Sequence, residues 1–238
     1  MPIKSSRLVY EFDRRFDRFT GEQKPAIRLE HKMSLLNEAT QIFFENRVKL
    51  AEINSRVRDE LRPLEEKERR LKVNNKSTEV AVADIPTESF RVLRAVATIS
   101  RPGCGQKKVP VVMMATDDLT RARKNAFWRS SFEWEHILGD EGKEGLYLYH
   151  DGEFSVDEVT IDFYRRPAEL HAPSMSTKKE YVDWNGVTRK KDVDLELDNT
   201  FAYRKIVDIA VLLARADIGD QRDLQVSITK ILQTEPNL

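Results

Sequence analysis

The chain has almost no cysteine, no long apolar run and no net charge. Its 238 residues include a single cysteine, Cys104, which excludes an intrachain disulfide framework and any zinc or iron–sulfur site built from several cysteines. No stretch approaches the ~18–20 uninterrupted apolar residues that a membrane-spanning helix needs. Because the N-terminus, Met1–Arg7, lacks the apolar core of a secretory signal, we expect an intracellular protein without membrane contact.

The charges balance: 40 Lys and Arg residues oppose 40 Asp and Glu residues. Affinity for nucleic acid arises when Lys and Arg neutralise phosphates, so bulk basicity cannot supply it here. Charged residues nevertheless make up 34% of the chain, with both signs mixed. Such mixing favours specific pairing between surfaces more than raw affinity.

The first zone, roughly residues 6–72, is nearly free of glycine and proline. An apolar residue recurs at every seventh position, which is typical of one helical face. The spacing predicts a helix from about residue 29 to residue 62, a short helical extension over Pro63–Leu71, and an earlier helix over Arg7–Phe19. This heptad stripe packs on the protein's own core in the simpler interpretation, and forms a coiled coil in the other. Its members are Leu36, Phe43, Leu50, Val57 and Leu64.

The middle zone, residues 77–166, changes to a period of two. Leu93–Ile99 alternates apolar and polar side chains, which predicts a strand. Asp151-Gly152 predicts a hairpin that joins Leu146–Tyr149 to a return strand with Val159, Ile161 and Phe163 on one face. A helical insertion is expected within Asp117–Glu135. The zone therefore predicts a small antiparallel sheet.

The last zone begins with a long polar stretch, typical of a functional or partner-ordered loop. A helical hairpin follows, whose first helix carries Ile206, Ile209, Ala210, Leu213 and Ala216 on its apolar face. We expect an α+β, mainly helical fold around a small antiparallel β-sheet domain. The expected divisions are a helical module (1–76), a β-rich domain with a helical insertion (77–170), an extended polar loop (171–198) and a helical hairpin packing on the N-terminal helices (199–238).

Few residues are placed for chemistry. Neither glycine-rich phosphate-binding motif occurs, and the four histidines are scattered. Cys104, near Lys107 and Lys108, could present a reactive thiol, but its flanking glycines favour a surface turn. Asp117 and Asp118 could supply oxygen ligands to a metal, but adjacent carboxylates before a helix favour an N-terminal cap. We expect no enzymatic activity, no metal and no cofactor.

Basic and aromatic residues are interleaved over Arg121–Arg129, as in proteins that bind single-stranded nucleic acid. Core filling, or an aromatic anchor at a protein interface, is the favoured interpretation. The candidate interface residues over the whole chain are Glu52, Arg58, Arg62, Leu64, Trp128, Trp134, Tyr181 and Trp184.

Four passages, in this order, resemble the tail-adaptor or head–tail connector ring proteins of tailed bacteriophages, nearest to those of crAss-like phages. The first is similar to the family's short N-terminal helix, the second to its helix with an Asn-Glu-Ala core, and the third to its charged Arg-Asp-Asp-Leu-Arg-Pro-Leu segment, with Glu60 in place of an aspartate. The fourth is similar to its strand ending in Arg-Arg-Pro and its closing helix. The passages are Leu8–Phe19, Leu35–Phe43, Arg58–Leu64 with the preceding Glu52, and Ile161–Pro167 followed by Leu195–Leu197 and Ile206–Val211.

The resemblance implies a structural virion protein without catalytic activity. Its copies would form a dodecameric ring that connects the portal to the tail and extends the DNA channel. The implied partners are the portal protein, further tail or ring proteins, other copies of the chain, and double-stranded DNA that passes without sequence-specific binding. The implied location is the neck of the virion at the portal vertex, and the host cytoplasm during assembly. Residues 171–194 are the candidate contact with the portal or the next ring. The alternative is a coiled-coil protein that binds nucleic acid through residues 121–129.

Overall fold

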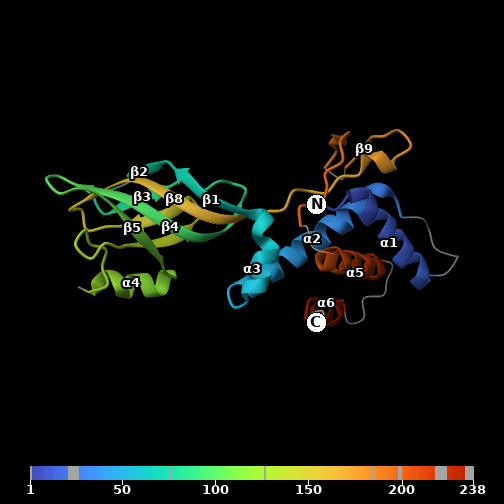
Figure 1. Ribbon diagram of the computed structural model, residues 1–238, viewed down its shortest axis with the longest axis horizontal. Coiled ribbons are helices and arrows are strands. Elements are labelled where there is room, and N and C mark those ends of the chain that lie inside the picture. The colour runs from blue at the N-terminus through green and yellow to red at the C-terminus, as the bar shows by residue number, and fades with distance from the viewer. Residues whose placement is uncertain are drawn as a thin grey trace. The chain divides into compact units, whose positions relative to one another are not determined.

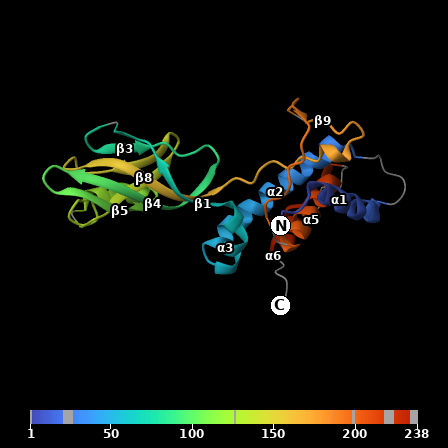
Figure 2. The ribbon, with the colours of Figure 1, turned by 45° about the horizontal axis from the view of Figure 1, so that its top comes forward.

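The computed structural model describes residues 2–20, 27–75, 77–125, 127–183, 185–197, 200–217 and 224–233. The chain forms two compact units (Figures 1 and 2). The helical unit comprises Met1–Leu64 and Pro167–Leu238, and the barrel unit comprises Glu65–Arg166. The barrel unit is thus inserted into the helical unit. Its first and last strands pair, with Glu65 opposite Tyr164, so the chain enters and leaves this unit at one end of a strand pair, as insertion requires.

The expectation of a mainly helical protein with a small antiparallel sheet is wrong. The structure is 40% helical and 32% strand, and its large mixed sheet of eight strands is nearly barrel-shaped. One cause is Glu65–Leu71, which belongs to the predicted helical extension over Pro63–Leu71. This segment is instead a strand whose middle side chains face solvent, and pairing with its neighbour overrides the local propensity.

The sheet order is β1-β8-β4-β5-β6-β7-β3-β2, and its two outer members are consecutive in the chain, separated only by Lys72. One bent segment therefore pairs with β8 on one side and with β3 on the other, which closes the sheet and leaves little free edge. The β5–β6 pair is parallel, and α4 (Thr116–Lys124) lies in the connection between these strands. The strands are β1 (Glu65–Leu71), β2 (Val73–Asn75), β3 (Val80–Ala83), β4 (Ser89–Arg101), β5 (Gly105–Met113), β6 (Ile137–Gly142), β7 (Gly145–Tyr149) and β8 (Ser155–Arg165).

The predicted hairpin around Asp151-Gly152 is wrong, although both of its strands exist. β7 pairs with β6 and β3, whereas β8 pairs with β1 and β4. The turn instead directs the chain across the barrel: the side chain of Asp151 accepts the N–H of Glu153, and Nδ1 of His150 accepts that of Gly152. Local turn chemistry specified a reversal of the chain but not which strand would pair with the one that follows.

The interior of the barrel follows the predicted alternation. Ala95, Ala97 and Ile99 of β4 are buried, and so is the predicted face of β8, Val159, Ile161 and Phe163. The intervening residues are more exposed. This confirms the period-two interpretation of both strands and explains why they lie in the middle of a closed sheet, where one face is covered.

In the helical unit, the helices α1, α2 and α6 each pack on α5 (Figure 1). The long helix predicted over residues 29–62 breaks at Glu52–Asn54, because the side chain of Asn54 accepts the N–H of Arg56 and starts a new helix. The helical elements are α1 (Ser5–Thr20), α2 (Leu29–Ala51), α3 (Ser55–Leu61), η1 (Arg62–Leu64), α5 (Thr200–Asp217) and α6 (Leu224–Gln233).

The heptad stripe faces the interior of this unit. Leu36, Phe43, Val57 and Leu64 are buried, while Leu50 is only half-buried. The apolar face predicted for α5 is also buried, and α2 lies along it. Since the stripe is covered by the chain itself, the simpler interpretation is confirmed, and the stripe does not support the coiled coil of the alternative hypothesis.

The segment expected as an extended polar loop contains η2 (Pro173–Met175) and a small hairpin of β9 (Tyr181–Val182) and β10 (Thr188–Arg189). Backbone bridges join Ile3 to Leu195 and His171 to Val193. Ser5 donates its hydroxyl hydrogen to the carbonyl of His171 at 2.9 Å. Contacts within the chain therefore order much of this segment without a partner protein.

Candidate interaction surfaces

The structure places the predicted interface residues in different environments. Two of them, Leu64 and Tyr181, are buried and belong to the core of the helical unit. Trp184 lies outside the described residues. The exposed ones fall into two groups on different units, namely Glu52, Arg58 and Arg62 near the end of α2, and Trp128 and Trp134 on the barrel unit.

The first group surrounds the turn between α2 and α3, which we name the α2–α3 corner (residues 52–62). Its most exposed apolar side chain is Ile53, 84% of which is accessible. Ile53 follows Leu50 by three positions, at the intermediate offset of the heptad stripe, so periodicity alone places it on the buried face. The available signal was Asn54, a preferred helix cap, which turns the preceding residues away from the helical face.

A second exposed apolar surface lies on the β9–β10 hairpin. Val182 and Val187 are about half exposed, as is Met175 in the preceding turn. The hairpin is held by Asp183, whose carboxylate accepts the N–H groups of Asn185 and Val187 and a hydrogen bond from Arg189. The hydrogen bond from the Val187 N–H has the largest effect in lowering the pKa of Asp183, and the hydrogen bond from Arg189 lowers it further. The hairpin therefore presents its valines on a fixed backbone.

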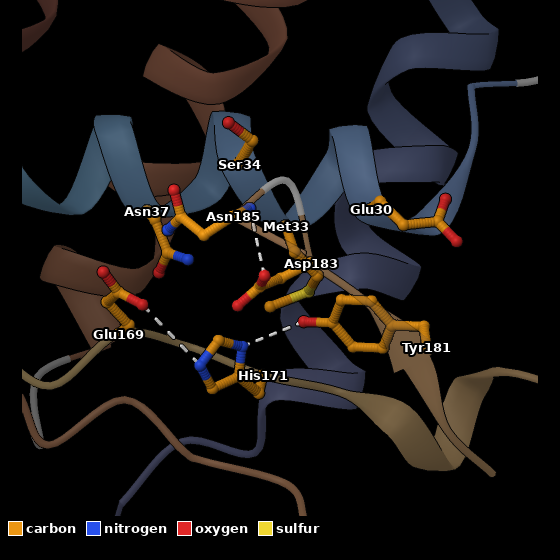
Figure 3. A pocket seen from close by; sticks show the side chains of 9 residues that line it. All are labelled: Glu30, Met33, Ser34, Asn37, Glu169, His171, Tyr181, Asp183 and Asn185. Atoms are coloured by element: carbon orange, nitrogen blue, oxygen red, sulfur yellow. Dashed lines mark hydrogen bonds and ion pairs between the residues drawn. The ribbon is translucent and has the colours of Figure 1, made fainter. Parts of the chain in front are cut away.

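A small pocket of about 90 Å³ separates this hairpin from the start of α2 (Figure 3). Sites for drug-sized ligands occupy about 300–1,000 Å³, so this pocket is too small for an organic substrate. Its polar groups bind one another: Nδ1 of His171 lies 2.9 Å from the hydroxyl of Tyr181. Its lining residues are Glu30, Met33, Ser34, Asn37, Glu169, His171, Tyr181, Asp183 and Asn185.

Asn37 explains how the segment beside the pocket is attached to α2. Its side-chain amide donates to the carbonyl of Leu170 at 3.2 Å, and its side-chain oxygen accepts the N–H of Leu170 at 2.7 Å. A side chain thus completes the hydrogen bonds that a neighbouring strand would otherwise make. These contacts attach the segment that leads into the hairpin to α2.

Acidification is expected to destabilise the helical unit through His171. Burial, and then the nearby Arg189, lower the pKa of His171, against the opposing effects of Glu169 and Asp183. Its folded pKa therefore lies below the unfolded value near 6.5, so the unfolded state binds the proton first and stability falls as the pH drops below about 6.5. Urea unfolding between about pH 7 and about pH 5 measures this slope, and His171→Gln should flatten it.

Tyr181→Phe is the control for that experiment. Burial raises the pKa of Tyr181 to about 12, so its hydroxyl stays neutral over the range tested. The variant removes the hydroxyl that contacts His171 while keeping the ring, and should cost about 1 kcal/mol at every pH without removing the slope. A slope that disappears in Tyr181→Phe but persists in His171→Gln would contradict the assignment.

The second group lies on the connection between α4 and β6, which we name the aromatic loop (residues 125–136). Phe127, Trp128 and Trp134 are 77%, 58% and 63% exposed, whereas Phe132 is buried in the barrel core. The sequence had suggested either core filling or an anchor for the aromatic cluster. The structure separates the cluster into one core residue and three surface residues.

Hydrogen bonds fix the backbone of the aromatic loop. The side-chain oxygen of Asn125 accepts a hydrogen bond from the N–H of Phe127. The backbone carbonyl of Asn125 accepts hydrogen bonds from the N–H groups of Trp128 and Arg129. The ring nitrogens of His136 lie 3.2 Å and 3.4 Å from the carbonyl oxygens of Trp128 and Trp134. Because a neutral imidazole has one N–H, the ring can donate to only one of these two carbonyls in a given tautomer. These hydrogen bonds lower the conformational entropy that the loop would lose on binding.

The residues considered for chemistry are not gathered into a site. Cys104 is exposed in the turn between β4 and β5, as the flanking glycines predicted. Asp117 and Asp118 lie in the first turn of α4, where carboxylates interact favourably with the helix dipole. Within the described ranges, no group of three or more His, Cys, Asp and Glu side chains could hold a metal ion.

Each helix in the described part of the chain is too short or too polar to cross a membrane.

No protein-family model matches the chain, and no curated protein sequence matches it either.

Proposed function

We propose that the chain is a structural subunit of a head–tail connector ring in a tailed bacteriophage, and that the helical unit makes the contacts between copies. The observation that carries this proposal is a pair of exposed apolar surfaces at opposite ends of α2. The β9–β10 hairpin lies beside its start, and the α2–α3 corner follows its end. A helix rises 1.5 Å per residue, so the two surfaces are roughly 30 Å apart.

Two different surfaces on one subunit are what a ring requires. Contacts between unlike surfaces propagate from copy to copy and close when the rotation between copies allows it. At the corner, Ile53 supplies the apolar contact, and Glu52, Arg58 and Arg62 are exposed charged residues of the same corner. At the hairpin, Val182 and Val187 supply the apolar contact. In the proposed ring, the corner of one copy meets the hairpin of the next.

The sequence resemblance supports the same unit. Its first three passages fall on α1, α2 and α3–η1, and the fourth continues from the end of β8 into α5. Almost all of the resemblance therefore lies in the helical unit, although this unit is split in the sequence by the inserted barrel. The portal, other tail proteins and passing double-stranded DNA remain the proposed partners.

The ring is tested by single-residue variants at each surface. Ile53→Asp and Val182→Asp should each prevent incorporation of the chain into a ring on the portal, because a carboxylate replaces an apolar anchor whose loss costs at least about 2 kcal/mol. Both side chains are exposed, so the melting temperature should stay close to that of the parent. Cryo-electron microscopy of the portal vertex reads out the ring. Tyr10→Asp, an exposed position on α1, is the matched control.

A mixture of the two variants provides a second measurement. The Ile53→Asp variant keeps an intact hairpin, and the Val182→Asp variant keeps an intact corner, so these two surfaces can still bind each other. The opposite contact joins the altered corner to the altered hairpin and should not form. Unlike copies should therefore pair, and the assembly should stop at dimers in sedimentation with the portal protein present. Closed rings from either variant alone, or a portal vertex that lacks the chain, would refute the proposal.

A further inference from the structure

Around the aromatic loop, the acidic side chains form ion pairs, whereas several of the basic side chains do not. Its acidic side chains are paired within the barrel unit: Glu133 binds Arg101, and Glu135 binds Lys107. On the adjacent face of α4, Arg123 binds Glu79. By contrast, the exposed Arg121, Lys124 and Arg129 have no ion-pair partner among the residues that the structure describes. The uncompensated charge beside Phe127 and Trp128 is therefore positive.

A pocket of about 220 Å³ opens next to this loop and is lined by Arg123, Arg129, Ser130 and His150, together with Glu79, Tyr149 and Asp151. Arg123 forms an ion pair with Glu79, and its guanidinium carbon lies 4.9 Å from the centre of the Tyr149 ring. Among the described lining residues, Arg129 is a cation without an ion-pair partner, and Asp151 is a carboxylate without one. Arg129 directly follows Trp128 in the chain, so the pocket is continuous with the aromatic loop.

His150, which lines the pocket, carries a buried ring nitrogen without a hydrogen-bond partner among the described residues. The side chain is only 9% exposed, and its Nδ1 accepts the N–H of Gly152. The proton of the neutral ring is therefore on Nε2, which is buried and has no hydrogen-bond partner in the described part of the chain. Burial lowers the pKa of His150, in keeping with a neutral ring. A buried donor without an acceptor is costly, so a polar ligand that displaced the side chains covering Nε2 would gain a hydrogen bond there.

We propose that this surface binds single-stranded nucleic acid, with a backbone phosphate held by Arg129 beside this pocket and adjacent bases stacked on Trp128, Trp134 and Phe127. Flat, exposed aromatic rings beside unpaired cations are the recognition elements of such binders, since every base offers a π-face and every nucleotide a phosphate. The closed sheet has little free edge for strand addition by a peptide, and the acidic residues of the aromatic loop, Glu133 and Glu135, are already paired.

Fluorescence titration of the full chain with an oligothymidylate of about 12 nucleotides tests the proposal. Binding should weaken with salt, with a slope of log K against log salt near about −2 for three neutralised phosphates. Trp128→Ala and Trp134→Ala should each reduce affinity at least about fivefold, through lost stacking. Arg129→Gln should weaken binding and make the slope shallower by about 0.7.

Two variants serve as matched controls. Lys108→Gln removes an exposed cation from β5 of the same barrel unit, and Tyr10→Ala removes an exposed aromatic ring from the helical unit; both should bind like the parent. No binding at low salt, equal losses in the control variants, or a preference for the duplex of the same length would overturn the proposal. So would binding of poly-glutamate by this surface in place of the oligonucleotide, which would assign the surface to an acidic protein.

Discussion

Gly145→Ala is expected to destabilise the barrel unit by roughly 3 kcal/mol or more. Gly145 begins β7 directly after the two-residue turn from β6, with a φ of +139° that side-chain-bearing residues rarely adopt. A Cβ atom there would lie only 2.3 Å from the carbonyl oxygen of Ala83 in β3. Because this obstacle is backbone in a paired strand, relieving it requires β3 and β7 to separate. Hydrogen exchange of the β3 and β7 amides measures the loss in this unit directly.

Gly105→Ala is the matched control. Gly105 also begins a strand after a tight turn and also has a positive φ, +77°, but nothing lies within 4 Å of its Cβ position. The substitution should cost only the backbone strain, about 1 kcal/mol. The difference between the two variants therefore isolates the steric effect of β3. Equal losses would show that β3 and β7 are not as close as the structure places them.

Arg47→Glu is expected to unfold the helical unit, or to reduce its stability by at least about 3–5 kcal/mol. Arg47 is 2% exposed and lies between two aromatic rings, 5.1 Å from that of Phe43 and 4.9 Å from that of Phe201. It forms an ion pair with Glu60 of α3 at 3.5 Å. The variant places a second carboxylate beside Glu60 in a buried position and loses both cation–π contacts. Urea unfolding followed by far-UV circular dichroism gives the change.

Two further variants separate burial from charge. Lys49→Glu makes the same charge change on the exposed side of α2 and should cost no more than about 1 kcal/mol, through its effect on the helix dipole. Arg47→Met keeps an unbranched apolar side chain between the rings and adds no second carboxylate, so it should cost less than Arg47→Glu, although it leaves the buried Oε2 of Glu60 without its cation. If Arg47→Glu unfolded at the same urea concentration as Lys49→Glu, Arg47 could not be buried.

The interaction surfaces show the limit of one-dimensional patterns. Arg121–Arg129 was recognisable as a basic and aromatic cluster, but its spacing could not show that Phe127 and Trp128 face solvent while Phe132 fills the core. The pocket beside the cluster was not predictable at all. Its histidine follows β7, more than twenty residues after Arg129, and the two meet only because β7 pairs with β6.

Ile53 and Leu64 illustrate the same limit in the helical unit. Both fit a helical spacing, yet Ile53 is exposed and Leu64 is buried. The cap at Asn54 restarts the helix and changes which side of the chain faces the core. Periodicity assigns faces correctly within one helix and loses its phase wherever the helix is interrupted.

The sequence by itself determined the charged composition of the chain, the helices α1, α2, α4, α5 and α6, the inward faces of β4 and β8, and the absence of an intrachain disulfide framework. Each of these follows from composition or from contacts between residues near one another in the chain. Only the tertiary structure decided that Glu65–Leu71 is a strand, that the sheet closes through β1 and β2, and that β7 and β8 do not pair. These outcomes depend on hydrogen bonds between segments up to about a hundred residues apart, such as Glu65 and Tyr164, and their pairing energy exceeds the local preferences that sequence patterns report.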